Sequence, residues 1–359
     1  MVRAHLCINL AFLPEKPTGL GTYALNLLAH LDWGDLVTLF SPRAVEPYPC
    51  CAVPAFLASD GGRWGHLARL GWQQTRLPAL YRALKADLLF SPLPESPLSA
   101  QCRSVVTVHD LIPLRFPGPF PSLLTRYFQY YVPRVLERAE HILCDSKATA
   151  SDIIRFYGIS AHKITPIALA HDAAHFYPRG LDQGNYFLYV GRQDRHKNLA
   201  RMIEAFARLR ADDYEFWIAG PQDLRQRPPL VAQIDRLGLQ RRVRFLDYVP
   251  YAQLPALVES AQALLFPTLW EGFGLPVLEA MACGTPVITS NLASLTEIAT
   301  GAALLVDPYR VEAIADAMQR ILTEPGLRTE LRERGLVRAT QFSWEHTAWQ
   351  TGELLARFV

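Results

Sequence analysis

The sequence predicts an α/β protein made of two Rossmann-like units, each built on a doubly wound parallel sheet. Short apolar runs alternate with amphipathic stretches from one end of the chain to the other, which is typical of parallel strands covered by helices on both faces. The runs fall into two sets of about six, separated by a stretch with little periodicity. A length of 359 residues provides material for two hydrophobic cores of ordinary size.

The expected strands are short runs rich in Val, Ile, Leu and Phe, with amphipathic helices between them. In the first half they cover residues 6–12, 36–40, 87–91, 104–110, 141–145 and 163–169. In the second half they cover residues 185–191, 214–220, 242–249, 262–268, 285–290 and 302–307. In such sheets a ligand binds outside the carboxyl ends of the strands, so we predict two domains facing across a cleft that holds the ligand.

The domain boundary is predicted near Pro178, in a stretch that also carries Gly180 and shows little periodicity. We therefore predict a first domain over residues 1–178 and a second domain over residues 179–343. Residues 344–359 have apolar side chains at helical spacing, and no later element covers them. We expect this last helix to pack back onto the first domain.

Composition excludes several classes of protein. Charged residues make up 19% and the hydrophobic set 50%, which argues against disorder, collagen and coiled coil. A formal net charge of +2 is not that of a nucleic-acid binder. The six cysteines show no CxxC spacing and mostly sit singly in apolar runs, so we expect reduced thiols in the cytoplasm, although the pair Cys50 and Cys51 has no explanation.

Residues 267–291 contain the most informative pattern. A strand ends at Pro267, a loop with two glycines follows, and Pro276 sits where a first helical turn tolerates proline best. Such a helix N-terminus after a glycine-containing loop can bind a phosphate. Glu271 and Glu279 flank this point, and their carboxylates could accept hydrogen bonds from sugar hydroxyls. The alternative is that Glu279 is a capping or solvated glutamate and the glycines only turn the chain.

A second pattern, GRQDRHKN at residues 191–198, follows an expected strand. It places the cations Arg192 and Lys197 at the mouth of the cleft, where they could neutralise a pyrophosphate. For Arg195 and His196 we expect simple exposure to solvent.

Two further features lie in the first half of the chain. The glycines Gly19 and Gly21 of TGLGTY fall between the first strand and the first helix, where backbone could approach a ligand. Position 24 is Ala24, so the third glycine of a dinucleotide-binding fingerprint is missing and NAD is not expected. His109 and Asp110 lie at the carboxyl end of an expected strand, and we expect Asp110 to fix its loop.

The spacing from Glu271 to Glu279, followed by AMACGTPVI, resembles the donor-site motif of the retaining family 4 glycosyltransferases, which have the GT-B fold. Residues 190–206, 217–221, 243–257 and 285–299 resemble further segments of that family in the same order. In the first half the resemblance is thinner and rests on residues 18–28, 106–110 and 139–153. It implies an acceptor-side first domain and a nucleotide-sugar donor domain after it.

The resemblance also implies roles for individual residues. Those implied to be catalytic are His109, which would face the transferred sugar, Glu271, Arg192 and Lys197. Those implied to bind the donor are Gly19, Gly21, Arg192, Lys197, Glu271, Gly272, Phe273, Gly274, Leu275 and Glu279. Glu271 would orient the hydroxyls of the sugar and Glu279 those of the ribose.

The implied reaction is hexosyl transfer from a nucleoside diphosphate sugar to a glycan or lipid-linked acceptor. GDP-mannose is the first expectation for the donor and UDP-glucose the second. The sequence contains no D-x-D motif and no Cys/His cluster with metal spacing, so we expect neither a metal nor another cofactor. A nucleotide-sugar epimerase of the same fold and a catalytically silent nucleotide-sugar binding protein remain as alternatives.

Residues 122–138 carry Arg126, Tyr130, Arg134 and Arg138 four apart, which places them on one face of a helix. With Leu124 and its apolar neighbours facing inward, this face is either a solvated arginine surface or an interfacial helix that touches a membrane.

Overall fold

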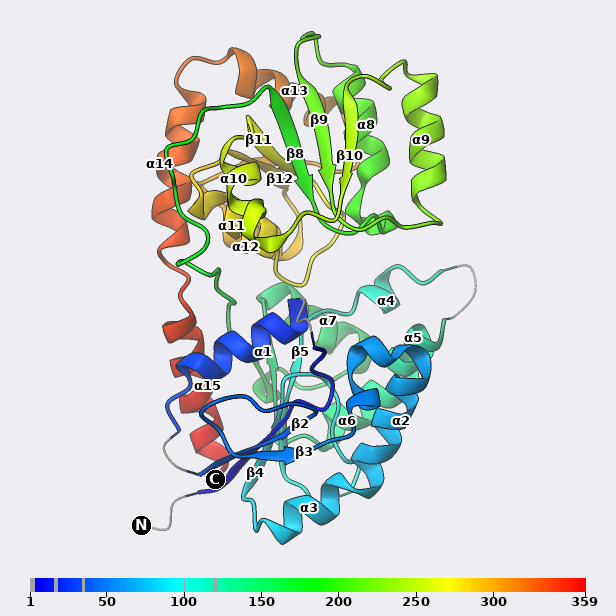
Figure 1. Ribbon diagram of the computed structural model, residues 1–359, viewed down its shortest axis with the longest axis vertical. Coiled ribbons are helices and arrows are strands. Elements are labelled where there is room, and N and C mark those ends of the chain that lie inside the picture. The colour runs from blue at the N-terminus through cyan, green and yellow to red at the C-terminus, as the bar shows by residue number, and fades with distance from the viewer. Residues whose placement is uncertain (1–3, 16–18, 34–35, 100, 119–121) are drawn as a thin grey trace. The chain divides into compact units, whose positions relative to one another are not determined.

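The computed structural model describes residues 4–15, 19–33, 36–99, 101–118 and 122–359. The chain divides into two compact units (Figure 1). The first comprises Met1–Leu169 together with Trp344–Val359, and the second comprises Ala170–Ser343. None of the helices in the described part of the chain combines the length and apolarity that a bilayer crossing requires.

The first unit is built on a parallel sheet with the strand order β3-β2-β1-β4-β5-β6-β7. Its strands are β1 (Leu6–Asn9), β2 (Val37–Ser41), β3 (Cys50–Ala52), β4 (Leu88–Ser91), β5 (Ser104–Val108), β6 (His141–Cys144) and β7 (Ile164–Pro166). Strand β3 was not predicted, because it is a short, partly exposed edge strand without an apolar run. It accounts for Cys50 and Cys51, which pair with Leu39 and Phe40 of β2.

Helices cover the sheet of the first unit. They are α1 (Gly19–His30), α2 (Gly62–Thr75), α3 (Leu77–Ala83), α4 (Ile112–Arg115), α5 (Leu123–Arg126), α6 (Val132–Arg138), α7 (Lys147–Tyr157) and α15 (Trp344–Leu355). The last helix belongs to this unit: Thr347 donates a hydrogen bond to the carbonyl of Ala168 at 2.8 Å, and the ring of Trp344 lies 6.1 Å from that of Tyr23 on α1. This contact buries the apolar face that had no local cover.

The segment predicted as one helix over residues 122–138 is three elements, with a π-helical turn over Tyr127–Tyr131 between α5 and α6. A π turn adds a residue to the repeat and shifts the faces of the helix before and after it. The prediction that Leu124 faces inward was therefore wrong: it is 52% exposed, whereas Phe128 and Tyr131 do pack against the core.

The second unit has six parallel strands in the order β10-β9-β8-β11-β12-β13, all of them at predicted positions. The strands are β8 (Tyr186–Val190), β9 (Glu215–Ala219), β10 (Val243–Asp247), β11 (Ala263–Phe266), β12 (Val287–Ser290) and β13 (Leu304–Val306). The helices are α8 (Leu199–Ala207), α9 (Arg227–Arg236), α10 (Leu254–Glu259), α11 (Leu275–Ala282), α12 (Ala293–Ala299), α13 (Val311–Thr323) and α14 (Leu327–Ala339). The predicted fold class is confirmed.

The division between the units falls after Leu169, nine residues before the position expected from Pro178. Contacts within the second unit hold the intervening stretch. The ring of His175 stacks on Tyr251 with centroids 3.9 Å apart, and the backbone N–H of Arg179 donates to the carboxylate of Glu259 at 2.8 Å. Low periodicity therefore marked a segment without regular structure, and not a segment without contacts.

In each sheet the strand order reverses once, between β1 and β4 in the first unit and between β8 and β11 in the second. Connections from the two central strands run to opposite sides at such a point, which leaves a crevice at their carboxyl ends. In the second unit the loops at this crevice are residues 191–198 and 267–274, the two stretches that the sequence singled out.

Candidate active site

The loop after β8 is fixed by its own polar contacts. Asn198 is buried, takes a left-handed conformation with φ of 67°, and donates from its side-chain amide to the carbonyls of Pro267 and Pro308 at 2.9 and 2.7 Å. Asn tolerates this conformation better than most residues. The hydroxyl of Tyr189 donates to the carbonyl of Arg192 at 2.6 Å. This loop is thus bonded to the loop after β11.

The loop after β11 ends at Gly274, which immediately precedes helix α11 and has a φ of 118°. A Cβ atom at Gly274 would lie 2.5 Å from the side chain of Leu295, so both the conformation and the space require glycine. Pro276 stands in the first turn of α11, as expected. The loop is also held by Ser294, whose hydroxyl donates to the carbonyl of Glu271 at 2.8 Å.

Lys197 and Glu271 form an ion pair at the crevice. The ammonium of Lys197 lies 2.8 Å from each carboxylate oxygen of Glu271, and the two side chains are only 15% and 10% exposed. Removing one member of such a pair would leave a largely buried, uncompensated charge. The structure therefore brings together a predicted cation and a predicted carboxylate one short loop before the N-terminus of α11.

Glu279 lies on α11, and its environment differs from that of Glu271. Its side chain is half-buried, and its carboxyl has no hydrogen-bond or ion-pair partner among the described residues. Burial and the negative charge of Asp172 raise the pKa of Glu279 to about 7. An unpartnered, partly desolvated carboxyl of this kind is suited to accepting hydrogen bonds from ligand hydroxyls.

The remaining predicted residues of the second unit differ in their exposure and contacts. Arg192 is 73% exposed and pairs with Asp194 at 3.2 Å, so it does not join the Lys197 pair. Gly272 is buried and Leu275 half-buried, whereas the ring of Phe273 packs inward, 6.0 Å from Phe342.

The expectation that His196 is exposed was wrong, although Arg195 is exposed as expected. His196 lies in a turn of 3₁₀ helix over Arg195–Lys197, and its carbonyl accepts a hydrogen bond from the backbone N–H of Leu269 at 2.8 Å. That bond draws His196 into the protein, and burial lowers the pKa of its ring.

In the first unit, the glycines of TGLGTY do not form a loop. Gly19 and Gly21 lie in the first turn of α1, and Gly19 is exposed with open space where a Cβ would stand. Thr18, the first residue of the motif, lies outside the described residues. Nothing in the geometry of the described residues requires glycine at position 19, so a contact to a ligand there stays a prediction.

His109 follows β5 at the carboxyl edge of the first sheet and is bonded through both ring nitrogens. Its Nδ1 lies 2.8 Å from a carboxylate oxygen of Asp145, and its Nε2 lies 2.9 Å from the carbonyl oxygen of Pro92. The neighbouring Asp110 accepts a hydrogen bond from the backbone N–H of Ile112 at 2.9 Å, which is a contact that fixes the loop.

Comparison with known proteins identifies the family. The model of the glycosyl transferases group 1 matches residues 175–338, and that of glycosyltransferase family 4 matches residues 17–175. The O-antigen chain mannosyltransferase RfbU of Salmonella typhimurium is 32% identical over 328 residues, which cover 88% of this chain and 90% of that protein. The chain belongs to glycosyltransferase family 4.

Other relatives agree with this assignment. The glycosyltransferase is 32% identical to the O-antigen chain mannosyltransferase B of Escherichia coli over 274 residues, or 69% of each chain. In fold it is similar to sucrose-phosphate synthase from Thermosynechococcus elongatus, with a TM-score of 0.78 and 22% identity over 99% of both chains. It is also similar to WaaG, a glycosyltransferase involved in lipopolysaccharide biosynthesis, with a TM-score of 0.73 and 18% identity over 97% of this chain and 99% of that one. The fold is GT-B.

The residues that hold this site in place were not predicted from the sequence. Tyr189, Asn198 and Ser294 support the two loops of the glycosyltransferase, and Asp145 holds His109. A strand-end tyrosine or a helix-start serine is common in any α/β protein. Only Asn198 carried a usable signal, since Asn is enriched among residues with positive φ.

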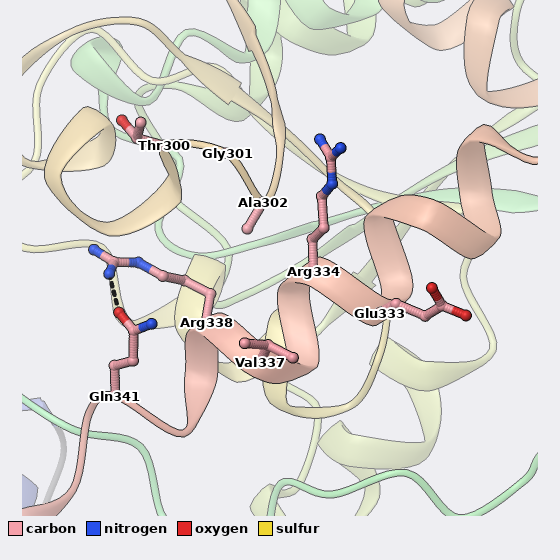
Figure 2. Close-up of a pocket in the computed structure, with 8 residues that line it drawn as sticks. All are labelled: Thr300, Gly301, Ala302, Glu333, Arg334, Val337, Arg338 and Gln341. Carbon is pink, nitrogen blue, oxygen red and sulfur yellow. Dashed lines mark hydrogen bonds between the residues drawn. The ribbon is translucent and has the colours of Figure 1, made fainter.

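A surface hollow of about 390 Å³ lies elsewhere in the second unit of the glycosyltransferase (Figure 2). It runs between residues 300–302 and helix α14, and it contains none of the predicted site residues. Figure 2 shows Arg338 bonded to Gln341, and its guanidinium also donates to the carbonyl of Ile298 at 2.8 Å, near the end of α12. Arg338 thereby caps the helix whose first turn holds the Glu271 loop, which is a supporting role.

Proposed function

We propose that this glycosyltransferase is a retaining hexosyltransferase that moves mannose, or as a second possibility glucose, from a nucleoside diphosphate sugar to a glycan or lipid-linked acceptor. One observation carries the proposal: the Lys197–Glu271 pair sits one loop before the N-terminus of α11, and the same helix carries the unpartnered Glu279. The site thus offers a lysine and the N-terminus of a helix for a diphosphate, and carboxylates for hydroxyls.

In this proposal Lys197, Arg192 and the N-terminus of α11 bind the diphosphate, Glu279 binds the ribose and Glu271 orients the sugar. Arg192 is free to turn toward a ligand because its present partner, Asp194, is a surface contact worth little. Gly272, Gly274 and Leu275 would contribute backbone contacts. Gly19, Gly21 and His109 belong to the first unit, so their part in the reaction stays a prediction.

The proposed chemical step is a front-side displacement. The bond between the sugar C1 and the diphosphate oxygen breaks, and the acceptor oxygen bonds to C1 on the same face. The acceptor hydroxyl passes its proton to the departing phosphate. Cations fixed beside the leaving group stabilise the charge that develops on it, which is where electrostatic catalysis is most effective.

We propose that the reaction needs no metal and no further cofactor. The sequence contains no D-x-D motif, and Lys197, Arg192 and the helix N-terminus supply positive charge at the proposed diphosphate site. Among the described residues, no group of three or more His, Cys, Asp or Glu is placed to hold a metal ion.

The proposed sugar and acceptor rest on the relatives. Both mannosyltransferases named above act on O-antigen chains according to their names, which supports mannose, with GDP-mannose as the first donor to test, and a growing glycan as the acceptor. A nucleotide-sugar epimerase would release a changed sugar without any acceptor. A silent binding protein would bind the donor and release nothing.

Two variants test the assignment. After a thermal-shift screen of GDP, UDP and ADP sugars, Glu279→Ala should weaken binding of the preferred nucleotide about tenfold or more, as loss of a charged hydrogen-bond partner implies. Lys197→Ala should lower kcat about 100-fold, with a smaller effect on Kd. Arg195→Ala, a neighbouring exposed cation, is the matched control. Calorimetry and kinetics in which both variants match the parent would overturn the site.

Peripheral membrane contact is part of the proposal. Around residues 122–138, Leu123, Tyr130 and the cations Arg126 and Arg134 are exposed, the mixture found on interfacial helices. Arg138, the fourth residue of the predicted face, instead donates to the carbonyl of Leu98. Flotation with liposomes checks this: binding should rise with the fraction of anionic lipid, and binding that ignores it would remove the membrane role.

A further inference from the structure

The hydrogen bonds of His109 fix the number of protons that the His109–Asp145 pair holds. The carbonyl oxygen of Pro92, 2.9 Å from Nε2, can only accept a hydrogen bond, so Nε2 must carry a proton. Nδ1 lies 2.8 Å from a carboxyl oxygen of Asp145, and that contact also needs a proton. The His109–Asp145 pair therefore holds two protons, one more than a neutral imidazole beside an ordinary carboxylate.

The charges around the ring favour placing both protons on His109. Burial alone would lower the pKa of His109, but the Asp145 carboxylate and the Pro92 carbonyl raise it above its usual value. Burial raises the pKa of Asp145, which His109 opposes. Asp110 is the other charged group facing the ring among the described residues, and it too favours the cation. Tyr23, edge-on at 4.7 Å, is neutral because burial raises its pKa.

Both partners of the ring are held rigidly. Pro92 begins the segment that follows β4, and Glu95 in that segment is 3% exposed and bound by Arg69 at 2.8 and 2.9 Å. Asp145 directly follows β6 and precedes Ser146, whose hydroxyl accepts a hydrogen bond from the backbone N–H of Thr149 and caps α7. Neither acceptor can move away from His109 without breaking buried contacts.

We propose that Asp145 is a positioning residue that keeps His109 doubly protonated, so that His109 acts in the transfer reaction as a fixed hydrogen-bond donor and not as a base. This inference rests on the proposed function for its catalytic consequence. An oxygen of the substrate can share the Nε2 proton with the Pro92 carbonyl. Neither ring nitrogen keeps a free lone pair, so His109 cannot take the proton of the acceptor hydroxyl. That proton must pass to another group, which in the front-side step proposed above is the departing phosphate.

Nitrogen NMR of the full chain labelled with ¹⁵N-histidine tests the protonation directly, without any need for activity. The His109 signals, assigned by their loss in His109→Gln, should both be of the protonated type at pH 8. In Asp145→Asn one should become the unprotonated type, because an amide can donate to Nδ1 and preserve the geometry without the charge. An unprotonated signal in the parent, or an unchanged pair in Asp145→Asn, would overturn the inference.

The pH dependence of GDP release from GDP-mannose in the presence of acceptor tests the consequence. Asp145→Asn should show a new decline of about tenfold in kcat between pH 6 and 8.5, while the parent and the control variant Asp182→Asn, at an exposed position of the second unit, lack it. A profile for Asp145→Asn parallel to that of the parent would refute the donor role. If NMR shows the doubly protonated ring but the protein transfers no sugar, the proposed function is wrong, whereas the protonation of the His109–Asp145 pair is confirmed.

Discussion

The two glutamates of the donor motif show how local surroundings separate side chains of identical chemistry. Glu271 is neutralised by Lys197 and fixed through its carbonyl by Ser294, whereas Glu279 is unpartnered and lies near a second negative charge, Asp172. A carboxyl already held by a cation is preorganised to position a ligand. A carboxyl without a partner gains its hydrogen bonds only when a ligand arrives, so Glu279 should couple binding to pH.

We predict that affinity for the nucleoside diphosphate rises between pH 6 and pH 8. Glu279 has a pKa of about 7 in the free protein, and its carboxylate accepts hydroxyl hydrogen bonds better than its neutral acid. Calorimetric titration of GDP at both pH values checks this. Glu279→Gln should bind more weakly at pH 8 and lose that pH dependence, whereas Glu333→Gln, on the exposed face of α14, should retain it.

Glu279 also makes the stability of the fold depend on pH, but stability falls with rising pH whereas affinity rises. The folded protein binds more protons than the unfolded chain between the ordinary value of 4.5 and about pH 7, so Glu279 lowers stability as pH rises through that window. Above pH 7 and without ligand, the Glu279→Gln variant should be more stable than the parent by about 1–2 kcal/mol, a figure reduced for the partial exposure of the side chain. Equal denaturation midpoints at pH 8 would show that the carboxyl is not perturbed.

At the scale of elements, the loops at the reversal of strand order depend on close backbone contacts. Gly220, directly after β9, has a φ of 146°, and a Cβ there would lie 1.9 Å from the carbonyl oxygen of Gly191, directly after β8. Gly301 also has a positive φ, of 79°, but has open space around it. Substitutions at Gly220 and Gly301 therefore distinguish the effect of a steric clash from that of backbone strain alone.

Gly220→Ala should destabilise the protein by about 3 kcal/mol or more, because the backbone of the site loop must move. Gly301→Ala should cost only about 1–2 kcal/mol, the strain of a left-handed alanine. Chemical denaturation of both variants measures the difference, and GDP titration should show a loss of affinity in Gly220→Ala alone. Similar midpoints for the two variants would contradict the account.

Sequence patterns predicted the regular elements better than their interruptions. Strands buried on both faces appear in the sequence as apolar runs, so twelve of the described strands were predicted. Strand β3 was missed because its residues, such as Cys50, lie at a half-exposed edge of the sheet. The π turn over Tyr127–Tyr131 left no local signal, since its cost is met by packing against residues distant in sequence.

Of the predicted site residues, Lys197 and Glu271 lie together, at a place that chain direction alone fixes. Lys197 and Glu271 meet because parallel strands deliver both loops to one edge of the sheet. The burial of His196 and the inward ring of Phe273 depend on contacts with Leu269 and Phe342, which no local pattern specifies. The partners of His109 could not be predicted either, because Pro92 and Asp145 follow two other strands, β4 and β6.

At the scale of the whole molecule, the chain is a family 4 glycosyltransferase of two units, and the second contains the proposed nucleotide site. Each unit has its own reversal of strand order and its own polar residues at the carboxyl edge. Net charge and composition revealed none of this, because a few placed side chains are enough to bind a diphosphate. We therefore propose a location for the donor, on the loops after β8 and β11.

Hydrogen exchange of the full chain, followed by mass spectrometry with and without saturating GDP, tests that location most directly. We predict slower exchange in peptides covering residues 191–198 and 267–282, and unchanged exchange in helix α14 beside the hollow of Figure 2. Repeating the experiment with UDP covers the second choice of nucleotide. Protection confined to residues 300–302 and α14, or absent from both loops with either nucleotide, would contradict the account.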